Sequence, residues 1–462
     1  MLFRGTFVHF PVFYSLDILR DHVLQVGVGG EITYIGPAAH ERSIELLSNP
    51  QEELTSLQDG EFLLPSFVDL HLHAPQYLYA GNGLDLPLME WLDKYTYKAE
   101  ERLDADPKLA RAVYTRLARR LIECGTGAAL FFGTIKAETN LILAQAMREA
   151  GLRAFVGKLS MDISSRKTYV EGSSDKALAA ARGFIGQCDD VNATGSGPRV
   201  APVITPRFVP TCSPALLDGL GELAKEHDVR VQSHLAEAHD QVAWVRAERG
   251  AEDIDVFDKH GLLTPRTVQA HCTFLDPPDL DLLSARGSAI AHCPLSNAYF
   301  SARPFRLREA LTQGVKVGLG SDVAGGYALD LMHAMRQAVI VSRMREGERL
   351  SHGDKEGGPK ATSNLAINWK EAVYLATRGG AFALGLPQGA GSFVVGAPFD
   401  CQRIRLYDSG SGVGVGALDF FDLELEPTGP HVLTEEMIEK WWCLGDARNR
   451  IDMYVQGRSL RS

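Results

Sequence analysis

Eight short apolar runs, most of them followed by a segment with helix-like spacing, constrain the fold of this chain more than any other feature. The runs cover residues 67–73, 127–135, 153–159, 200–205, 229–234, 267–271, 288–293 and 315–320. Amphipathic patterns lie between or after them, for example at 216–227, 241–248 and 329–343. Eight strands that alternate with helices predict an α/β protein with a (β/α)8 TIM-type barrel. An open doubly wound sheet is the alternative, but no Gly-x-Gly-x-x-Gly sequence opens a helix here.

The two ends of the chain have a different pattern, in which short apolar stretches alternate with glycine and proline. They predict strands at 2–10, 23–28, 31–35, 391–395, 401–406 and 451–455. In the N-terminal part no substantial helix is expected. Because chain termini often lie close together, we expect residues 1–65 and 388–462 to form one small β-sandwich-like domain beside a barrel of residues 66–387. A glycine-rich patch at 409–416 predicts a loop, and the charged stretch 343–360 predicts an exposed insertion.

Charge and cysteine usage exclude several classes of partner. The formal net charge is -11 and the pI is near 5.7, whereas binding to nucleic acid or to an anionic membrane surface requires clustered Lys and Arg. The seven cysteines are scattered without a Cys-x-x-Cys pair, which favours a reducing compartment. The chain shows neither a secretory leader pattern nor an apolar run of about 20 residues. We therefore expect a cytoplasmic protein whose partners are small molecules or proteins.

Histidines and one aspartate mark the ends of the predicted barrel strands. His71 and His73 alternate on the first strand and must share one face of it, as Asp69 does. Taken alone, such a pair is more often one packed core histidine and one surface histidine. His234 and His271 end the fifth and sixth strands, and Asp322 follows the eighth. Since the carboxyl ends of barrel strands meet at one rim, we expect these side chains to converge on a metal ion. The expected ligands are His71, His73, His234 and Asp322.

Nitrogen and oxygen ligands without a thiolate suit one zinc ion per subunit, with iron(II) or manganese as alternatives. A water in an open coordination position would make the site catalytic, since a metal can bring the pKa of that water to about 7. His271 is either a fifth ligand or a group that orients the water, and we favour orientation.

Other polar residues near strand ends have two interpretations each. Glu237 is placed to move protons as a general acid/base, or it is an ordinary first-turn glutamate stabilised by the helix dipole. Lys158 could bridge two metals, but no second carboxylate-rich shell accompanies it, so we interpret it as structural. His292 is interpreted as structural as well. Arg207, which follows the fourth strand, is by itself most simply an ion pair at the barrel rim.

The motifs that carry these residues resemble the mononuclear branch of the amidohydrolase superfamily and, within it, the guanine deaminase family. They begin at Pro65, Thr205, Ser233, Ala291 and Gly318 and read Pro-x-Phe-Val-Asp-x-His-x-His-Ala-x-Gln-Tyr, Thr-Pro-Arg-Phe, Ser-His-Leu-Ala-Glu, Ala-His-Cys-Pro-x-Ser-Asn and Gly-Leu-Gly-Ser-Asp-Val-Ala-Gly-Gly-Tyr. They occur in the family's order from Pro65 to Tyr327.

The resemblance implies hydrolytic deamination of guanine to xanthine and ammonia, in purine catabolism or salvage, by a homodimer. It implies attack of a metal-activated water at C2, with protons moved by Glu237 and held or accepted by Asp322, and with His271 as a further catalytic group. The residues implied to bind guanine are His73, Ala74, Pro75, Gln76, Arg207, Phe208, His234, Glu237 and Asp322. Arg207 would donate to the carbonyl oxygen, Gln76 would pair with the amide edge, and Phe208 would stack on the ring.

Two other functions stay open at this point. A related deaminase could act on cytosine, 8-oxoguanine or a purine nucleoside with the same metal ligands and a different pocket. A barrel that has lost its metal could serve as a scaffold, but that would predict missing ligands, and here all are present. Zinc deaminases of the other fold are disfavoured, because their His-x-Glu and Pro-Cys-x-x-Cys motifs do not occur in the required arrangement.

Overall fold

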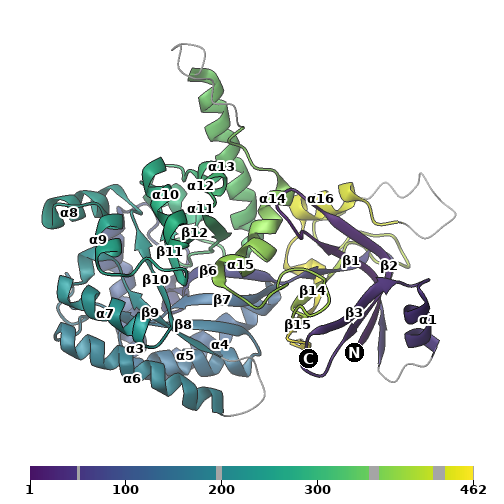
Figure 1. The fold of residues 1–462 in the computed structure, drawn as a ribbon, viewed down its shortest axis with the longest axis horizontal. Helices are drawn as coiled ribbons and strands as arrows, with labels where there is room; N and C mark the ends of the chain where they lie inside the picture. Colours follow the sequence, from purple (N-terminus) through teal and green to yellow (C-terminus); the bar gives the residue numbers. More distant parts are fainter. Residues whose placement is uncertain (49–52, 194–199, 353–363, 420–431, 461–462) are drawn as a thin grey trace.

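The computed structural model describes residues 1–48, 53–193, 200–352, 364–419 and 432–460. One of its two sheets has eight parallel strands whose spatial order follows their order in the chain (Figure 1). They are β6 (Phe67–His73), β7 (Thr126–Phe132), β8 (Arg153–Ser160), β9 (Ala201–Pro206), β10 (Arg230–Leu235), β11 (Thr267–His271), β12 (Ala289–His292) and β13 (Lys316–Leu319). The predicted (β/α)8 barrel is therefore confirmed.

Backbone hydrogen bonds between the first strand and the segment after the last strand close the barrel. The amide of Asp322 donates to the carbonyl of His71 over 2.8 Å, and the amide of His73 donates to the carbonyl of Val323 over 2.9 Å. The same two bonds hold Asp322 against the end of β6. Closure of the barrel thus positions two of the predicted ligand segments next to each other.

Helices cover the outside of the barrel and begin where the sequence signals require. In α4 (Pro107–Glu123) the Asp106 side chain accepts from the amides of Lys108 and Leu109, and Pro107 occupies the first helical position. The apolar face of this helix is buried at Ala110, Val113, Tyr114, Leu117, Ala118 and Leu121, with the three- and four-residue spacing of an amphipathic helix. The other helices of the barrel region are α5 (Ala137–Glu149), α6 (Ser174–Ala193), α7 (Pro214–Glu226), α8 (His239–Arg249), α9 (Asp253–Lys259), α10 (Pro277–Arg286), α11 (Pro294–Phe300), α12 (Leu307–Thr312), α13 (Leu331–His352), α14 (Trp369–Tyr374) and α15 (Gly380–Leu384).

The long connection between β6 and α4 has short helical turns of its own. It contains η1 (Ala74–Tyr79), α2 (Leu88–Trp91), the π-helical η2 (Leu92–Thr96) and α3 (Tyr97–Ala105). Aromatic and aliphatic side chains from this connection form a buried cluster with side chains from other barrel loops, including Phe208 and Phe300. The connection is therefore packed structure above the barrel rim.

The second sheet combines the two ends of the chain in the order β16-β15-β14-β5-β1-β2-β3, with β4 beside β1. Its strands are β1 (Leu2–His9), β2 (Asp17–Val26), β3 (Ile32–Pro37), β4 (Leu54–Ser56), β5 (Glu61–Pro65), β14 (Cys401–Arg405), β15 (Arg450–Val455) and β16 (Arg458–Ser459). The antiparallel pairing of β5 with β14, from Glu61↔Arg405 to Pro65↔Cys401, joins the two ends. Both termini lie on this side of the molecule in Figure 1. The exact domain boundaries at 65 and 388 stay a prediction.

Local predictions for the chain ends were wrong at two places. A helix, α1 (Glu41–Ser48), occurs in the N-terminal part, where only strands were expected. Residues 391–395 form no strand, although they are apolar. Phe393 is buried in the core of the terminal sheet, and Gly391 has a φ of +80°, so the segment turns and its hydrophobicity reflects burial instead of strand formation. The glycine-rich patch 409–416 consists of turns, as predicted.

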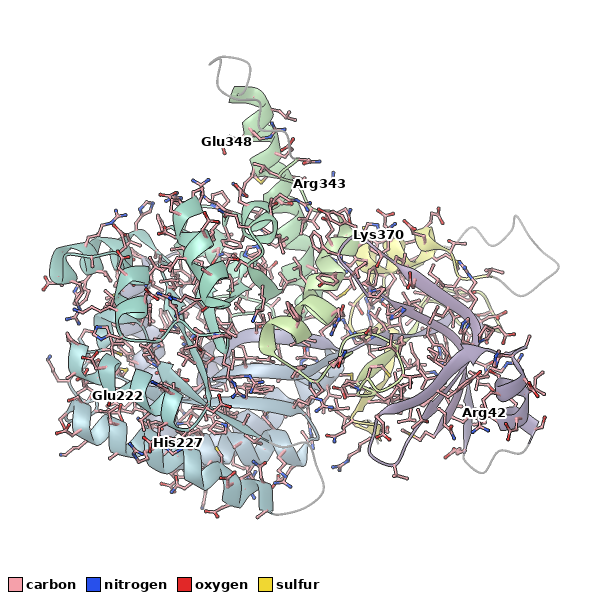
Figure 2. The ribbon with its side chains drawn as sticks, in the orientation of Figure 1. Arg42, Glu222, His227, Arg343, Glu348 and Lys370 are labelled. Atoms are coloured by element: carbon pink, nitrogen blue, oxygen red, sulfur yellow. The ribbon has the colours of Figure 1, made fainter. Side chains whose placement is uncertain are left out.

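The charged stretch predicted as an exposed insertion is partly a helix. Residues 343–352 form the C-terminal end of α13, which extends away from the rest of the molecule in Figure 1, and Figure 2 labels Arg343 and Glu348 on it. The first part of α13 belongs to the hydrophobic core. Residues 353–360 lie outside the described residues. Among the helices that the structure describes, none has the length and apolar character needed to cross a membrane.

Candidate active site

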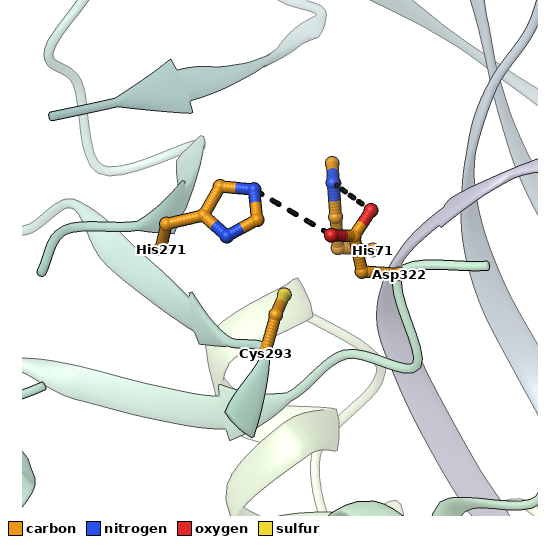
Figure 3. A group of neighbouring side chains, drawn as sticks. All are labelled: His71, His271, Cys293 and Asp322. Atoms are coloured by element: carbon orange, nitrogen blue, oxygen red, sulfur yellow. Dashed lines mark ion pairs between the residues drawn. The ribbon is translucent and has the colours of Figure 1, made fainter. Parts of the chain in front are cut away.

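The predicted ligands converge at the carboxyl ends of the barrel strands. His71 Nε2 lies 3.1 Å from Asp322 Oδ1, and His73 Nε2 lies 3.5 Å from the same oxygen. The Nε2 atoms of His73 and His234 are 3.0 Å apart. Figure 3 shows the ion pairs that His71 and His271 form with the Asp322 carboxylate, with Cys293 below them. One ligand atom from each residue lies within 4.8 Å of the others in three overlapping groups, His71–His73–His234, His71–His271–Cys293–Asp322 and His234–Glu237–His271.

Hydrogen bonds determine which ring nitrogens are available as ligands. His234 Nδ1 lies 2.7 Å from the carbonyl oxygen of Arg207, which can only accept, so Nδ1 carries the proton and Nε2 presents a lone pair. His271 Nδ1 lies 2.9 Å from Asn297 Oδ1, which assigns the same tautomer to that ring. The Nε2 atoms of His71 and His271 are buried, meet no hydrogen-bond geometry with a described residue, and lie 3.1 and 3.8 Å from the Asp322 carboxylate. Ring nitrogens grouped around one carboxylate in this way fit a metal ion.

Burial sets the charges of this cluster. Burial, assisted by repulsion from His71 and other nearby cations, lowers the pKa of His73 and of His234 well below the ordinary value. Burial lowers the pKa of His271 to about 4. Burial raises the pKa of Asp322, but His71 and His271 outweigh this and the net shift is downward. Neutral imidazoles and an ionised carboxylate are the protonation states that a divalent cation requires.

Strained backbone surrounds the cluster. Non-glycine residues in the left-handed region occur just after β10, β11 and β13, at Ala236 (φ 47°), His271 (71°), Cys272 (56°) and Asp322 (47°). Asp69 lies below them and accepts through Oδ1 from the amides of His71 (3.2 Å) and Ser321 (3.0 Å). These hydrogen bonds join Asp69 to backbone amides at both ends of the barrel closure. Burial raises its pKa to about 6.

A small cavity lies beside the cluster. Its polar lining comes from His73, Gln76, Arg207, His234, Glu237, Ser296 and Asp322, and its apolar lining from Leu88, Trp91, Leu92, Phe208, Phe300 and Gly325. Ala74 and Pro75 are buried at the start of η1, where they connect His73 to Gln76. They are not among the lining residues, whereas His73 and Gln76 are. Aromatic and aliphatic side chains together with several convergent polar groups suit a flat, polar heterocycle.

Glu237 lies at the junction of the metal cluster and the cavity. It precedes α8, which begins at His239, so it is not the first-turn glutamate that sequence spacing allowed. Its Oε1 lies 3.5 Å from His271 Nε2, and its carbonyl accepts from Thr273 Oγ1 over 2.7 Å. Burial, with repulsion from Asp322 and Asp240, raises the pKa of Glu237 well above its ordinary value. Glu237 can therefore hold a proton at neutral pH.

Arg207 forms an ion pair, which was the simplest expectation for an arginine at the barrel rim. The pair is buried. The Nη1 and Nη2 atoms of Arg207 donate to Glu100 Oε2 and Oε1 over 2.7 and 3.0 Å. Two other candidates have protein contacts that agree with the structural interpretation. Lys158 is buried in an ion pair with Glu171, and the His292 ring packs on Phe305 at a centroid distance of 5.0 Å.

Sequence reasoning did not find several residues of the site. Glu100, Trp91 and Phe300 lie in loops and helices whose local pattern carries no chemical signal. Ser296 and Asn297 belong to the motif that follows His292, where two small polar residues after a strand end were the available signal.

Comparisons with known proteins agree with this geometry. The Amidohydrolase family profile matches residues 62–440. Guanine deaminase of Mus musculus is 37% identical over 464 residues, which cover 100% of this chain and 96% of that protein. Guanine deaminase of Homo sapiens is 36% identical, with 99% and 96% covered. The crystal structure of guanine deaminase from C. acetobutylicum with bound guanine in the active site superposes with a TM-score of 0.83 at 29% identity and covers 99% of both chains.

Proposed function

This chain belongs to the amidohydrolase family, and we propose that it catalyses the hydrolytic deamination of guanine to xanthine and ammonia. The observation that carries this proposal is the cavity, in which a fixed guanidinium, a glutamine amide and Phe208 stand beside the histidine and aspartate cluster. The full-length similarity to guanine deaminases supports the same substrate.

The cavity chemistry suits a purine with an oxygen at C6. Arg207 carries donors only, so it favours a carbonyl oxygen over an exocyclic amine at that position. The Gln76 amide can pair with the amide edge of the ring, and Phe208, which is buried, can pack against the ring face. Trp91 and Phe300 cover the cavity with ring centroids 5.0 Å apart.

His71, His73, His234 and Asp322 would hold one metal ion, which we propose to be zinc, with iron(II) as the alternative. When bound, such an ion lowers the pKa of a coordinated water and supplies the nucleophile at neutral pH. The buried, neutral imidazoles of His73 and His234 support this ligand set. His271 stands 3.8 Å from Asp322 Oδ2 and 3.5 Å from Glu237 Oε1, a position from which it can orient the attacking water.

Protons would be moved by the two carboxyl groups of the site. Glu237 has a raised pKa and lines the cavity, so it can protonate the ring nitrogen next to C2 and then the departing amine. Asp322 has a lowered pKa and faces His71 and His271, so it can accept the proton of the nucleophile. Two carboxyl groups whose pKa values are pushed apart are what an acid and a base in one site require.

The direct test incubates metal-replete protein with guanine and follows ammonia release together with the conversion of the guanine spectrum to that of xanthine. Cytosine, 8-oxoguanine and guanosine are assayed in parallel. Turnover of one of these compounds without turnover of guanine would contradict the proposed substrate. That result would not affect the barrel fold or the proposed metal site. Metal analysis of the purified protein, with chelation and re-addition of Zn²⁺ or Fe²⁺, tests the cofactor.

We also propose a cytoplasmic homodimer. Scattered unpaired cysteines, buried except for Cys443, support a reducing compartment. Light scattering coupled to size-exclusion chromatography tests the oligomeric state, and cell fractionation tests the compartment.

A further inference from the structure

Glu100 contacts both polar side chains that are proposed to recognise the purine. It lies on α3, is fully buried, and is not part of the cavity lining. Its Oε2 accepts from Arg207 Nη1 over 2.7 Å. Its Oε1 accepts from Arg207 Nη2 over 3.0 Å and from Gln76 Nε2 over 3.4 Å. One carboxylate therefore joins three segments of the chain, namely η1, α3 and the loop after β9.

The contact with Arg207 fixes the direction of the guanidinium. Two parallel N–H donors on one carboxylate hold the planar group far more rigidly than a single bond would. The Tyr97 ring, three residues earlier on the same face of α3, lies 5.0 Å from the guanidinium carbon and limits its movement out of the plane. Burial opposes the charge, but Glu100 outweighs this and raises the pKa of Arg207, so the side chain stays a cation inside the protein.

The contact with Gln76 fixes the orientation of its amide. Gln76 Nε2 donates to Glu100, and Gln76 Oε1 accepts from the amide of Ala324 over 3.3 Å. A flipped amide would place its oxygen against the Glu100 carboxylate and its NH2 group against a backbone donor. The Gln76 edge that faces the cavity therefore has a defined donor and acceptor side.

We propose that Glu100 is a positioning residue that determines purine selectivity by aligning Arg207 and Gln76 together. The proposal rests on the proposed function, since it assumes that these two side chains contact the substrate. Without Glu100, Arg207 is an unpaired buried cation that can rotate toward other acceptors, and the Gln76 amide is oriented by the Ala324 amide alone. Misplacement of a recognition group by about 1 Å can cost about 100-fold in rate.

The test compares Glu100→Gln with wild type in the metal-loaded protein, using guanine as substrate and 2-aminopurine, which lacks the oxygen at C6, as a competitive ligand. We expect kcat/KM for guanine to fall by about 100-fold, mostly through KM, while the inhibition constant of 2-aminopurine changes by less than about 3-fold. A merely structural role would weaken both ligands alike. Metal content and thermal midpoint are measured on the same samples.

Glu371→Gln is the matched control. Glu371 is as buried as Glu100 and holds Arg308 by two hydrogen bonds of 2.8 and 3.1 Å, but neither residue lines the cavity. This control should lower the thermal midpoint and leave the ratio of the two ligand constants unchanged. An equal loss of guanine and 2-aminopurine affinity in Glu100→Gln, or no loss of either, would overturn the positioning role.

Glu100→Asp keeps the proposal testable if Glu100→Gln does not fold. Its carboxylate is one carbon shorter, so it keeps the charge and displaces the contacts, and we expect about a 10-fold loss of guanine kcat/KM with the 2-aminopurine constant unchanged. Full wild-type activity in this variant would contradict the positional requirement. Absence of guanine turnover in the wild type would overturn the proposed function instead.

Discussion

Two buried arginine–glutamate pairs in this protein have nearly the same geometry and different surroundings. Arg207–Glu100 and Arg308–Glu371 each have two Nη–Oε hydrogen bonds between 2.7 and 3.1 Å. Arg308 also donates to Tyr14 and to the carbonyl of Ala366, and its glutamate caps α14 by accepting from the amide of Asn368. The Arg207 side chain makes no hydrogen bond to a described residue besides Glu100, and it lines the cavity.

The two pairs differ in the hydrogen-bond donors that each arginine has left after it binds its glutamate. Arg308 uses its Nη donors to join α12, α14 and the N-terminal segment, so it contributes to stability. Arg207 keeps donors directed at a cavity, which leaves part of its hydrogen-bonding capacity for a ligand. An arginine with a partner on one side and a cavity on the other is a binding group that has been oriented in advance.

The largest expected effect comes from the metal cluster that stands beside Arg207 and has no counterpart near Arg308. His234→Ala should lose the metal and reduce kcat by more than about 1,000-fold, because the water is no longer activated. His260→Ala is the control, since His260 is a buried histidine bound to Asp218 at 2.5 Å and remote from the ligands. Metal content and guanine turnover are measured for both variants. Retention of metal and activity by His234→Ala would disprove the ligand assignment.

Glu237→Gln should have the next largest effect. It removes the proposed acid and leaves the size of the side chain unchanged, so we expect kcat to fall by about 100- to 10,000-fold with the metal still bound. Steady-state kinetics and metal analysis on one preparation separate the two properties. A variant that loses metal in parallel with activity would indicate a ligand role instead.

The two arginines can then be compared directly. Arg207→Ala and Arg308→Ala both leave a buried glutamate without its cation, which should cost about 3–5 kcal/mol of folding free energy each. Only Arg207→Ala should also reduce kcat/KM for guanine, by about 100-fold. Urea unfolding and kinetics at a temperature where both variants are folded provide the measurements. Equal kinetic effects of the two substitutions would refute the distinction drawn between the pairs.

The smallest effect concerns a buried carboxyl group that forms no ion pair among the described residues. Burial raises the pKa of Asp253 from 3.8 to about 7. The folded state therefore holds a proton that the unfolded chain has lost, and stability contributed by this group falls as the pH rises from about 4 to about 7, by up to about 4 kcal/mol. Asp253→Asn should flatten this part of the pH–stability profile, measured by urea unfolding. Since Gln241 links Asp253 to the amide of Glu237, activity is recorded too. An unchanged pH profile would show that the Asp253 proton is not retained.

The sequence predicted most of the elements that build the site, because their signals are local. All eight barrel strands lie within a few residues of their expected positions, and the helix after Asp106 begins at Pro107. The strand-end positions of His71, His73, His234 and His271 follow directly from those strands. The position of Asp322 follows from the end of β13, the last of these strands. The local error at 391–395 arose because the apolar residues there are buried without pairing as a strand.

By itself, the sequence thus determined the barrel, the histidine and aspartate cluster at its rim and the family to which the chain belongs. Hydrophobic periodicity and the positions of residues at strand ends are local features, so they do not depend on the path of the loops. Only the tertiary structure decided which acid stands beside His271, which aromatic side chains cover the cavity, and that Glu100 holds Arg207 and Gln76. Glu100 is 24 residues from Gln76 and 107 from Arg207 along the chain. Contacts over such separations leave no local pattern, because they depend on how the loops pack above the barrel.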